Sequence, residues 1–358
     1  MALTGAMSAG ISGLKAHMDA LNVVGNNVAN VNTQGYKPGR VTFMESIYST
    51  QSAGSAGTAT VGGTNPRQTG YGVGIGTIDL DMSSRSLDST GRGMDCAIQG
   101  DGFFLVGDKT HDIDSMDALK GLTLTRVGNF EFRDGYLTDG QGNVVYGFIT
   151  RSNGDAPGTT PGDKPSTDLV PIRLPMKSTD PNSKGDAVYV GVDNQTGANV
   201  YPDNDPAATV DGFVDLENIS IDKNGKITGT NKDTGDPVVV GYIALGSVEN
   251  LNGVLHTEGP YYTAGDAAGD IRGGTPGNSV TGNLRNDKIT DGNNVVDPDS
   301  ALAEGSGATL MTGFLEASGT DLAAEFANMI IYQRGYQANT RIVTVTDTML
   351  EELVNMKR

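Results

Sequence analysis

The chain has 358 residues, 51 of them glycine, and a formal net charge of −18 at pH 7. This length suffices for two or three small domains, and a glycine content of about twice the average is typical of many turns and short strands. Such an acidic chain without a cluster of Lys and Arg excludes nucleic acid and anionic membrane surfaces as expected partners.

Two further properties limit the class of protein. No stretch reaches about 18 consecutive apolar residues, so we expect no membrane insertion. Cys96 is the only cysteine, which excludes an internal disulfide, and its neighbours Ala97 and Ile98 favour burial as a small apolar side chain over reactivity.

The first thirty residues predict an amphipathic helix. Apolar side chains recur in steps of three and four, with Gly25 filling one position of the heptad-like row. A secretory signal is excluded because no basic segment precedes Lys15 and polar residues interrupt every turn. We predict that the row makes subunit contacts; it consists of Leu3, Met7, Ile11, Leu14, Met18, Leu21 and Val28.

The helix is expected to end within NNVANVNTQGYK, residues Asn26–Lys37. The asparagines and Thr33 compete with the helical backbone through their side chains. Gly35 favours the left-handed conformation that stops a helix, and Pro38 prevents the helix from resuming. The segment therefore predicts a helix exit that leads into extended chain.

Residues 33–71 are expected to form an extended arm or linker. Their composition is rich in Gly, Ser and Thr, which alone would indicate a flexible linker. The apolar side chains between Val41 and Tyr48 favour an ordered arm instead.

From Ile75 the sequence becomes β-rich. Ala97–Val106 is a turn followed by a short apolar run, and Leu124–Phe148 alternates around two turns, a pattern typical of a β-meander. A Pro/Gly/Asp stretch from residue 152 indicates a boundary before a second β block, residues 150–262, in which Asn224-Gly225 signals a hairpin. A glycine-rich acidic segment follows.

The last thirty-seven residues, Leu322–Arg358, predict a long second helix of roughly 50 Å. Asp321 and Glu325 at its start and basic residues at its end suit the helix dipole. A stripe of this length needs a partner helix, and the N-terminal helix is the candidate, together with copies from neighbouring subunits. The predicted contact row is Met329, Tyr332, Tyr336, Asn339, Val343, Thr346, Leu350 and Leu353.

Candidate chemistry is scarce, and we predict no catalytic residue, no metal site and no cofactor. His111-Asp112-Ile113-Asp114 could supply metal ligands but resembles a solvated loop. Asp222–Gly225 imitates the start of a calcium loop without its distal glutamate, so a hairpin turn is favoured, and Asp203–Asp205 is expected to be a surface turn. His17 is expected to pack on the first helix or face solvent. No motif places a base beside a nucleophile, which argues against an enzyme.

The helix exit resembles the N-terminal signature of the bacterial flagellar rod and hook proteins. Residues 97–148 are also similar to motifs of this family, and the tail Ala338–Lys357 resembles hook proteins more closely than distal-rod proteins. The signature residues are Asn27, Asn30, Thr33, Gly35, Tyr36 and Lys37.

The resemblance implies a mixed α and β fold with a nested architecture. Residues 1–32 and 322–358 would pair as a coiled-coil-like inner domain, followed by the arm. Residues 72–149 with 263–315 would form a β-rich domain, and residues 150–262 would be an inserted domain that faces outward.

The resemblance further implies a structural subunit that assembles helically into the hook, the curved tube that transmits motor torque to the filament. Implied partners are further copies of the chain, the rod, hook-cap and hook–filament junction proteins, and the flagellar export apparatus. The implied location is the extracellular flagellum, reached without a cleavable signal peptide. A short inserted region keeps a distal rod protein as an alternative. A secreted β-rich enzyme or adhesin is an alternative of another class, and electron microscopy of the concentrated protein would separate a polymer from a monomer.

Overall fold

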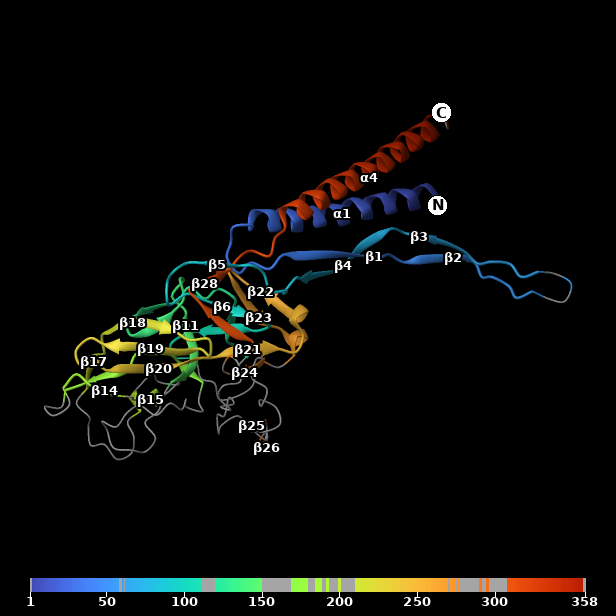
Figure 1. Ribbon diagram of the computed structural model, residues 1–358. Coiled ribbons are helices and arrows are strands. Elements are labelled where there is room, and N and C mark those ends of the chain that lie inside the picture. The colour runs from blue at the N-terminus through green and yellow to red at the C-terminus, as the bar shows by residue number, and fades with distance from the viewer. Residues whose placement is uncertain are drawn as a thin grey trace. The chain divides into compact units, whose positions relative to one another are not determined.

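The computed structural model describes residues 2–57, 60, 62–110, 120–149, 169–179, 184–188, 191–192, 199–200, 210–269, 271–274, 276, 290–291, 294–295 and 308–356 (Figure 1). The chain forms two compact units. Unit 1 comprises Met1–Thr33, Lys37–Asp81 and Ser318–Arg358, and unit 2 comprises Gln34–Tyr36 and Met82–Ala317. The chain therefore passes between the units four times, after residues 33, 36, 81 and 317.

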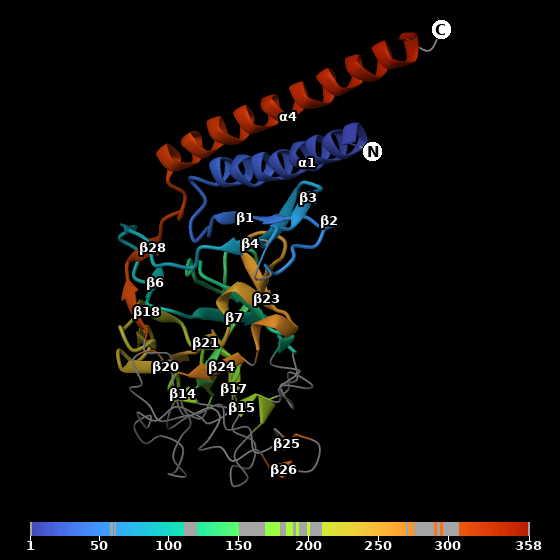
Figure 2. The ribbon, with the colours of Figure 1, turned by 90° about the vertical axis from the view of Figure 1, so that its right-hand side faces the viewer.

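Unit 1 contains both helices predicted from the termini. Helix α1 spans Ala2–Ala29 and helix α4 spans Leu322–Met356. They run antiparallel and side by side (Figures 1 and 2). The start of α4 is capped by Asp321, whose Oδ1 accepts hydrogen bonds from the backbone N–H groups of Ala323 (2.9 Å) and Ala324 (3.3 Å). In the described part of the chain, no helix is long and apolar enough to cross a membrane.

The arm is an antiparallel ribbon in unit 1. Strand β1 (Gly39–Glu45) pairs with β4 (Val73–Leu80), and β2 (Tyr48–Ser52) pairs with β3 (Arg67–Gly70). The expected end of the arm at residue 71 is therefore too early, because the returning strand continues to Leu80. Local composition does not reveal this, since strand pairing joins residues that are far apart in the sequence.

Unit 2 is built from short antiparallel strands, with the 3₁₀ turns η1 (Leu251–Gly253) and η2 (Asp266–Ala268). Along the path of its largest sheet the strand order is β18-β19-β20-β11-β7-β8-β23-β22. The strands are β5 (Leu87–Ser89), β6 (Cys96–Gln99), β7 (Phe103–Gly107), β8 (Thr123–Thr125), β9 (Glu131–Arg133), β10 (Tyr136–Thr138), β11 (Val144–Ile149), β12 (Val170–Pro171), β13 (Met176–Ser178), β14 (Ala187–Val188), β15 (Gly191–Val192), β16 (Asn199–Val200), β17 (Val210–Phe213), β18 (Leu216–Ile221), β19 (Lys226–Asn231), β20 (Pro237–Ile243), β21 (Leu245–Val248), β22 (Val254–His256), β23 (Tyr261–Ala264), β24 (Ile271–Gly274), β25 (Thr290–Asp291), β26 (Asn294–Val295), β27 (Thr309–Thr312) and β28 (Phe314–Glu316).

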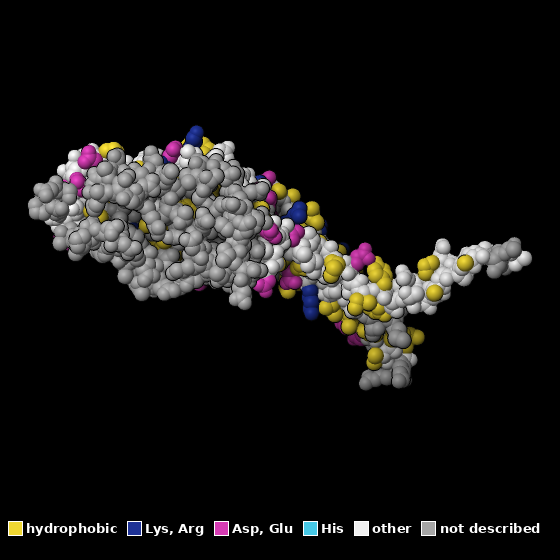
Figure 3. All heavy atoms as spheres, turned by 90° about the horizontal axis from the view of Figure 1, so that it is seen from below, with side chains coloured by type: hydrophobic (Ala, Val, Ile, Leu, Met, Phe, Trp, Pro, Cys, Tyr) yellow, Lys and Arg dark blue, Asp and Glu magenta, His cyan; other side chains and the backbone are white. Residues whose placement is uncertain are grey.

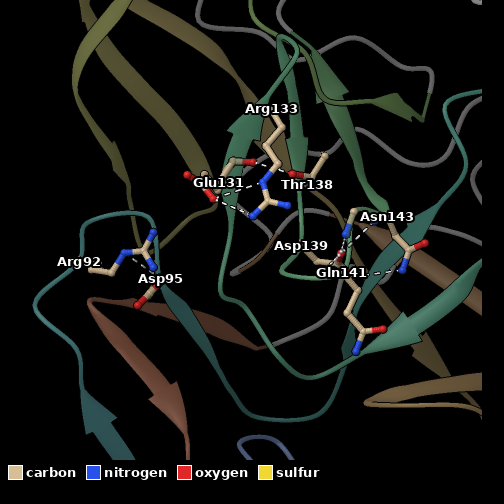
Figure 4. Close-up of polar contacts among 9 residues, drawn as sticks. Arg92, Asp95, Glu131, Arg133, Thr138, Asp139, Gln141 and Asn143 are labelled. Carbon is tan, nitrogen blue, oxygen red and sulfur yellow. Dashed lines mark hydrogen bonds and ion pairs between the residues drawn. The ribbon is translucent and has the colours of Figure 1, made fainter.

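The predicted meander is confirmed in β9, β10 and β11, each of which pairs with the next. Asp134 (φ 51°) and Gly135 (φ 80°) both have positive φ, as a two-residue hairpin requires. In the following turn, Asp139 accepts backbone hydrogen bonds from Gln141, Gly142 and Asn143 through Oδ1 (Figure 4). The Asp139 carboxylate therefore stabilises its own turn. The hairpin predicted at Asn224-Gly225 also forms, between β18 and β19.

The predicted boundaries at residues 150 and 262 do not divide the described sheet. Strand β20 pairs with β11, placing Phe148 opposite Tyr242, and β21 pairs with β7. Every residue of β11 is buried, which is typical of a central strand that needs a neighbour on each side. Residues 216–248 thus complete the sheet that residues 103–149 begin.

The core of unit 2 also brings distant segments together. Strand β27 pairs with β6 and β28 pairs with β5, so the end of the β region returns to its start. Cys96 is fully buried, as predicted, and burial raises the pKa of its thiol. The core cluster includes Cys96, Ile98, Phe104, Val106, Phe130, Leu137, Val145, Ile172, Ile221, Ile227, Val240, Ile243, Leu245 and Leu310.

Candidate assembly surface

Helices α1 and α4 approach each other closely at glycines. A Cβ placed on Gly10 would lie 3.2 Å from Val343 Cγ2, and one on Gly13 would lie 2.7 Å from Asn339 Nδ2. On α4, a Cβ on Gly335 would lie 2.6 Å from the ring of His17, which also contacts the rings of Phe43 and Tyr332. Gly10, Gly13 and Gly335 would each weaken an isolated helix, and they are positions at which the two helices approach each other closely.

The contact row of α1 lies one residue before the predicted row. Of the predicted residues, Ile11 and Met18 are exposed, whereas Met7, Leu14, Leu21 and Val28 are half-buried. The side chain of Leu3 lies outside the described residues. The periodicity of the sequence marks the large apolar side chains, whereas the positions that are buried in close helix packing carry mostly small ones. The buried positions of α1 are Gly10, Gly13, Ala16, Ala20, Val24 and Asn27.

The predicted row of α4 lies mostly on the half-buried side of that helix. Thr346 is buried and Met329, Tyr332, Asn339, Val343 and Leu350 are half-buried, whereas Tyr336 and Leu353 remain exposed. A role in subunit contacts for these side chains and for those of the α1 row remains a prediction.

A second apolar row on α4 was missed by the sequence analysis. From Ile331 to Met349, each of its positions precedes a position of the first row by one residue, so the two rows are about 100° apart around the helix. Its members are again three, four or seven residues apart in the sequence. Ile331 is 61% exposed and Val345 is 52% exposed. Figure 3 shows hydrophobic side chains at the surface of the helices and the arm. This outer row, as we call it, comprises Ala324, Ala327, Ile331, Ala338, Ile342, Val345, Met349 and Met356.

The signature residue Asn27 ties three segments of unit 1 together. Its side chain is 1% exposed. The Nδ2 group donates to the Gly39 carbonyl (2.9 Å) and to Glu325 Oε1 (3.0 Å), while Oδ1 accepts from the Gly39 N–H (3.0 Å). Asn27 therefore holds the end of α1, the start of the arm and the first turn of α4.

The other signature residues shape the exit from α1. Asn30 Nδ2 donates to the Asn26 carbonyl, Asn30 Oδ1 accepts from the Thr33 hydroxyl, and the Asn30 carbonyl accepts from Ser318 Oγ (2.9 Å). Gly35 has a φ of 68°, which confirms the predicted left-handed conformation. Tyr36 and Lys37 are buried.

Candidate metal ligands do not gather in the described ranges, where no three His, Cys, Asp or Glu side chains meet. His111–Asp114 and Asp203–Asp205 lie outside the described residues. Asp222 forms the hairpin turn favoured above, with Gly225 N–H bound to its carbonyl.

Comparison with known proteins gives matches at both ends and over the whole chain. The family described as flagella basal body rod protein matches residues 7–37, and the family described as flagellar basal body rod FlgEFG protein C-terminal matches residues 311–356. The chain is 32% identical to the flagellar basal-body rod protein FlgG of Bacillus subtilis over 357 residues, which covers 98% of this chain and 97% of the relative. The chain belongs to the flagellar hook and rod protein family.

Hook proteins are also among the relatives of this flagellar axial protein. It is 27% identical to the flagellar hook protein FlgE of Salmonella typhimurium over 430 aligned residues, covering 98% of this chain and 99% of the relative. The hook protein FlgE of Treponema pallidum is 46% identical over 103 residues, covering 28% of this chain and 22% of the relative. The named relatives are structural parts of the flagellum.

Glycine substitutions test the contact between the helices of this axial protein. Nothing lies within 4 Å of a Cβ on Gly25, so Gly25→Ala should stabilise unit 1 by about 0.5–1 kcal/mol through the higher helix propensity of alanine. Gly13→Leu should instead lower the melting temperature, because its side chain would displace Asn339. Thermal melts followed by far-ultraviolet circular dichroism measure both. Equal melting temperatures for the two variants would show that the helices do not pack through Gly13.

The carboxylate of Glu325 should make unit 1 sensitive to pH. Burial raises its pKa, and Asp321 adds to the increase, whereas the hydrogen bond from Asn27 opposes it. A raised folded-state pKa means that the folded protein binds the extra proton, so stability should increase as the pH falls through that pKa and level off below the unfolded-state value of about 4.3.

Glu325→Gln should remove this pH dependence while keeping an oxygen that accepts from Asn27. We expect the variant to be more stable than the parent at about pH 7 and to gain less on acidification. Thermal melts of parent and variant across the acidic range check the prediction. A variant whose melting temperature follows that of the parent at every pH would contradict it.

Proposed function

We propose that this chain is the structural subunit of the flagellar hook, a self-assembling tube that transmits motor torque to the filament. Support comes first from membership of the hook and rod family. It comes second from the apolar rows that both terminal helices leave exposed in a single chain, including Ile11 and Met18 on α1 and Ile331 and Val345 on α4. Exposed apolar rows of this length indicate an interaction surface.

The proposed occupant of these rows is a further copy of the chain. Each subunit presents one apolar row on α1 and one on α4, so helices of neighbouring subunits would bury both in a helical array. In this arrangement the paired terminal helices are the inner domain and the β-rich residues face outward. The polymer would need no catalysis, metal or cofactor.

The proposed partners outside the polymer are the rod, the hook-cap and hook–filament junction proteins, and the flagellar export apparatus. The proposed location is the extracellular flagellum, reached through that apparatus without a cleavable signal peptide. These proposals follow from family membership and the exposed rows.

Polymerisation of the purified chain tests the proposal. We expect tubes or short stacks in electron micrographs of concentrated protein, and a sedimenting fraction that grows with concentration. A chain that stays monomeric at every concentration would contradict the proposal and favour an enzyme or adhesin.

A distal rod subunit is the second candidate, and the lengths of the relatives favour it. The alignment with the Bacillus subtilis rod protein spans 357 residues, close to the 358 of this chain, whereas that with the Salmonella hook protein spans 430. The two candidates differ in the shape of the polymer. A curved, flexible tube supports the hook interpretation, and a straight, stiff one supports the rod interpretation.

A further inference from the structure

The segments of unit 2 that lead to unit 1 converge on one residue, Glu316, through its backbone and its side chain. Glu316 lies at the end of β28, directly before the last passage between the units. Its carbonyl accepts from the Gly35 N–H (2.8 Å), and its Oε1 accepts from the Arg85 N–H (3.2 Å). The next residue, Ala317, donates its N–H to the Ser86 carbonyl (3.0 Å). Three segments that are distant in sequence are therefore held together inside unit 2.

Arg126 connects this point to the sheet. Its Nε lies 3.2 Å from Glu316 Oε2, and the two side chains are 3% and 1% exposed. Its Nη1 donates to the carbonyls of Gly100 (2.9 Å) and Gly102 (2.7 Å), in the turn between β6 and β7. The guanidinium thus fixes the carboxylate relative to the turn that joins β6, which pairs with β27, to β7 of the largest sheet.

Net stability does not account for this arrangement. Removing two charges from water costs as much free energy as a buried ion pair usually returns, and apolar residues of similar volume often serve equally well. Apolar residues would not, however, make directional hydrogen bonds to the backbone. The Glu316 carboxylate accepts from the Arg85 N–H, and the Arg126 guanidinium donates to the Gly100 and Gly102 carbonyls, so the charged pair fixes these segments in one register.

We propose that Glu316 and Arg126 form a clamp that fixes the roots of the connecting segments at Gly35, Arg85 and Ala317. Because these segments are the covalent links to the terminal helices, a force on one link is shared with the others and passed to the sheet through Arg126. The clamp is a positioning device for load transmission, and its role in the polymer rests on the proposed function.

Hydrogen exchange of the full-length monomer tests the clamp directly. Glu316→Gln keeps an oxygen that accepts from Arg85 and removes the charge that holds Arg126. Amide exchange at Arg85, whose N–H bonds the carboxylate, should become roughly 10- to 100-fold faster, the range expected when a charge-assisted hydrogen bond is weakened. Exchange at Gly35 and Ala317, whose N–H groups bond backbone carbonyls beside it, should become faster as the clamp opens, whereas exchange in β11 should not change. The matched control is Glu131→Gln, which breaks the exposed Glu131–Arg133 pair (3.1 Å; Figure 4) and touches none of the three roots' hydrogen bonds. It should leave exchange at all three amides at the parental rate.

Arg126→Lys provides a second variant should Glu316→Gln fail to fold. Lysine keeps the charge but loses the fork that reaches Glu316 and both carbonyls, so the same three amides should exchange faster. Unchanged exchange at these amides in a folded variant would overturn the proposal.

Bending of the polymer tests the role in load transmission. Electron micrographs of assembled Glu316→Gln should show a shorter persistence length than those of the parent and of Glu131→Gln. Faster exchange with unchanged bending would overturn the load-sharing role. If the parent does not polymerise, the proposed function fails, while the exchange measurement still decides whether the clamp exists.

Discussion

Val345→Asp should strongly weaken polymerisation while leaving both units of the monomer folded. Val345 belongs to the outer row of α4 and is 52% exposed, so the monomer tolerates a charge there. In the proposed polymer this position is buried against a neighbouring helix. Loss of a buried valine costs about 1.5–3 kcal/mol, and an unpaired buried carboxylate costs more. The critical concentration should therefore increase by at least about 10- to 100-fold, as measured by sedimentation.

Thr344→Asp is the matched control for this variant. Thr344 is the preceding residue, also β-branched and exposed, and it lies outside the outer row. It should polymerise close to the parental concentration, and thermal melts of the two monomers should agree. Parental polymerisation by Val345→Asp would show that the outer row of α4 is not an assembly surface.

Replacement of residues 150–262 by a short linker should prevent unit 2 from folding. The deletion removes β20 from the edge of β11 and β21 from β7. It also removes the buried Val240, Ile243 and Leu245. At about 1.5–3 kcal/mol for each buried apolar side chain, losses across these strands exceed the roughly 5–15 kcal/mol by which a domain is stable. Limited proteolysis and near-ultraviolet circular dichroism would detect the unfolded region.

A shorter deletion provides the control. Replacing residues 189–209 removes β15 and β16, which pair with each other, and leaves β13, β14 and β17 in place. This variant should keep a cooperative melt and parental protease resistance. If the deletion of 150–262 also melts cooperatively, that block is an independent inserted domain, as the sequence alone suggested.

The sequence by itself determined the features that depend on neighbouring residues. The two helices begin and end close to the predicted positions because their apolar periodicity, the Asp321 cap and the bond from the Asn30 side chain to the Asn26 carbonyl act within a few residues. The meander follows from Asp134-Gly135 and from the side chain of Asp139, which binds its own turn. The signature that indicated the family is also a local feature, because all its residues lie within the continuous segment Asn26–Lys37.

Only the tertiary structure decided which surfaces meet. The contact face of α1 is set by Gly10 and Gly13, and glycine carries no apolar signal that marks a face until a partner such as Val343 approaches it. The extent of the arm and the union of residues 216–248 with the first β region depend on strand pairing, as between Phe148 and Tyr242. Pairing joins segments that share no local pattern, because hydrogen bonding between strands uses the backbone, which is the same in every residue except proline.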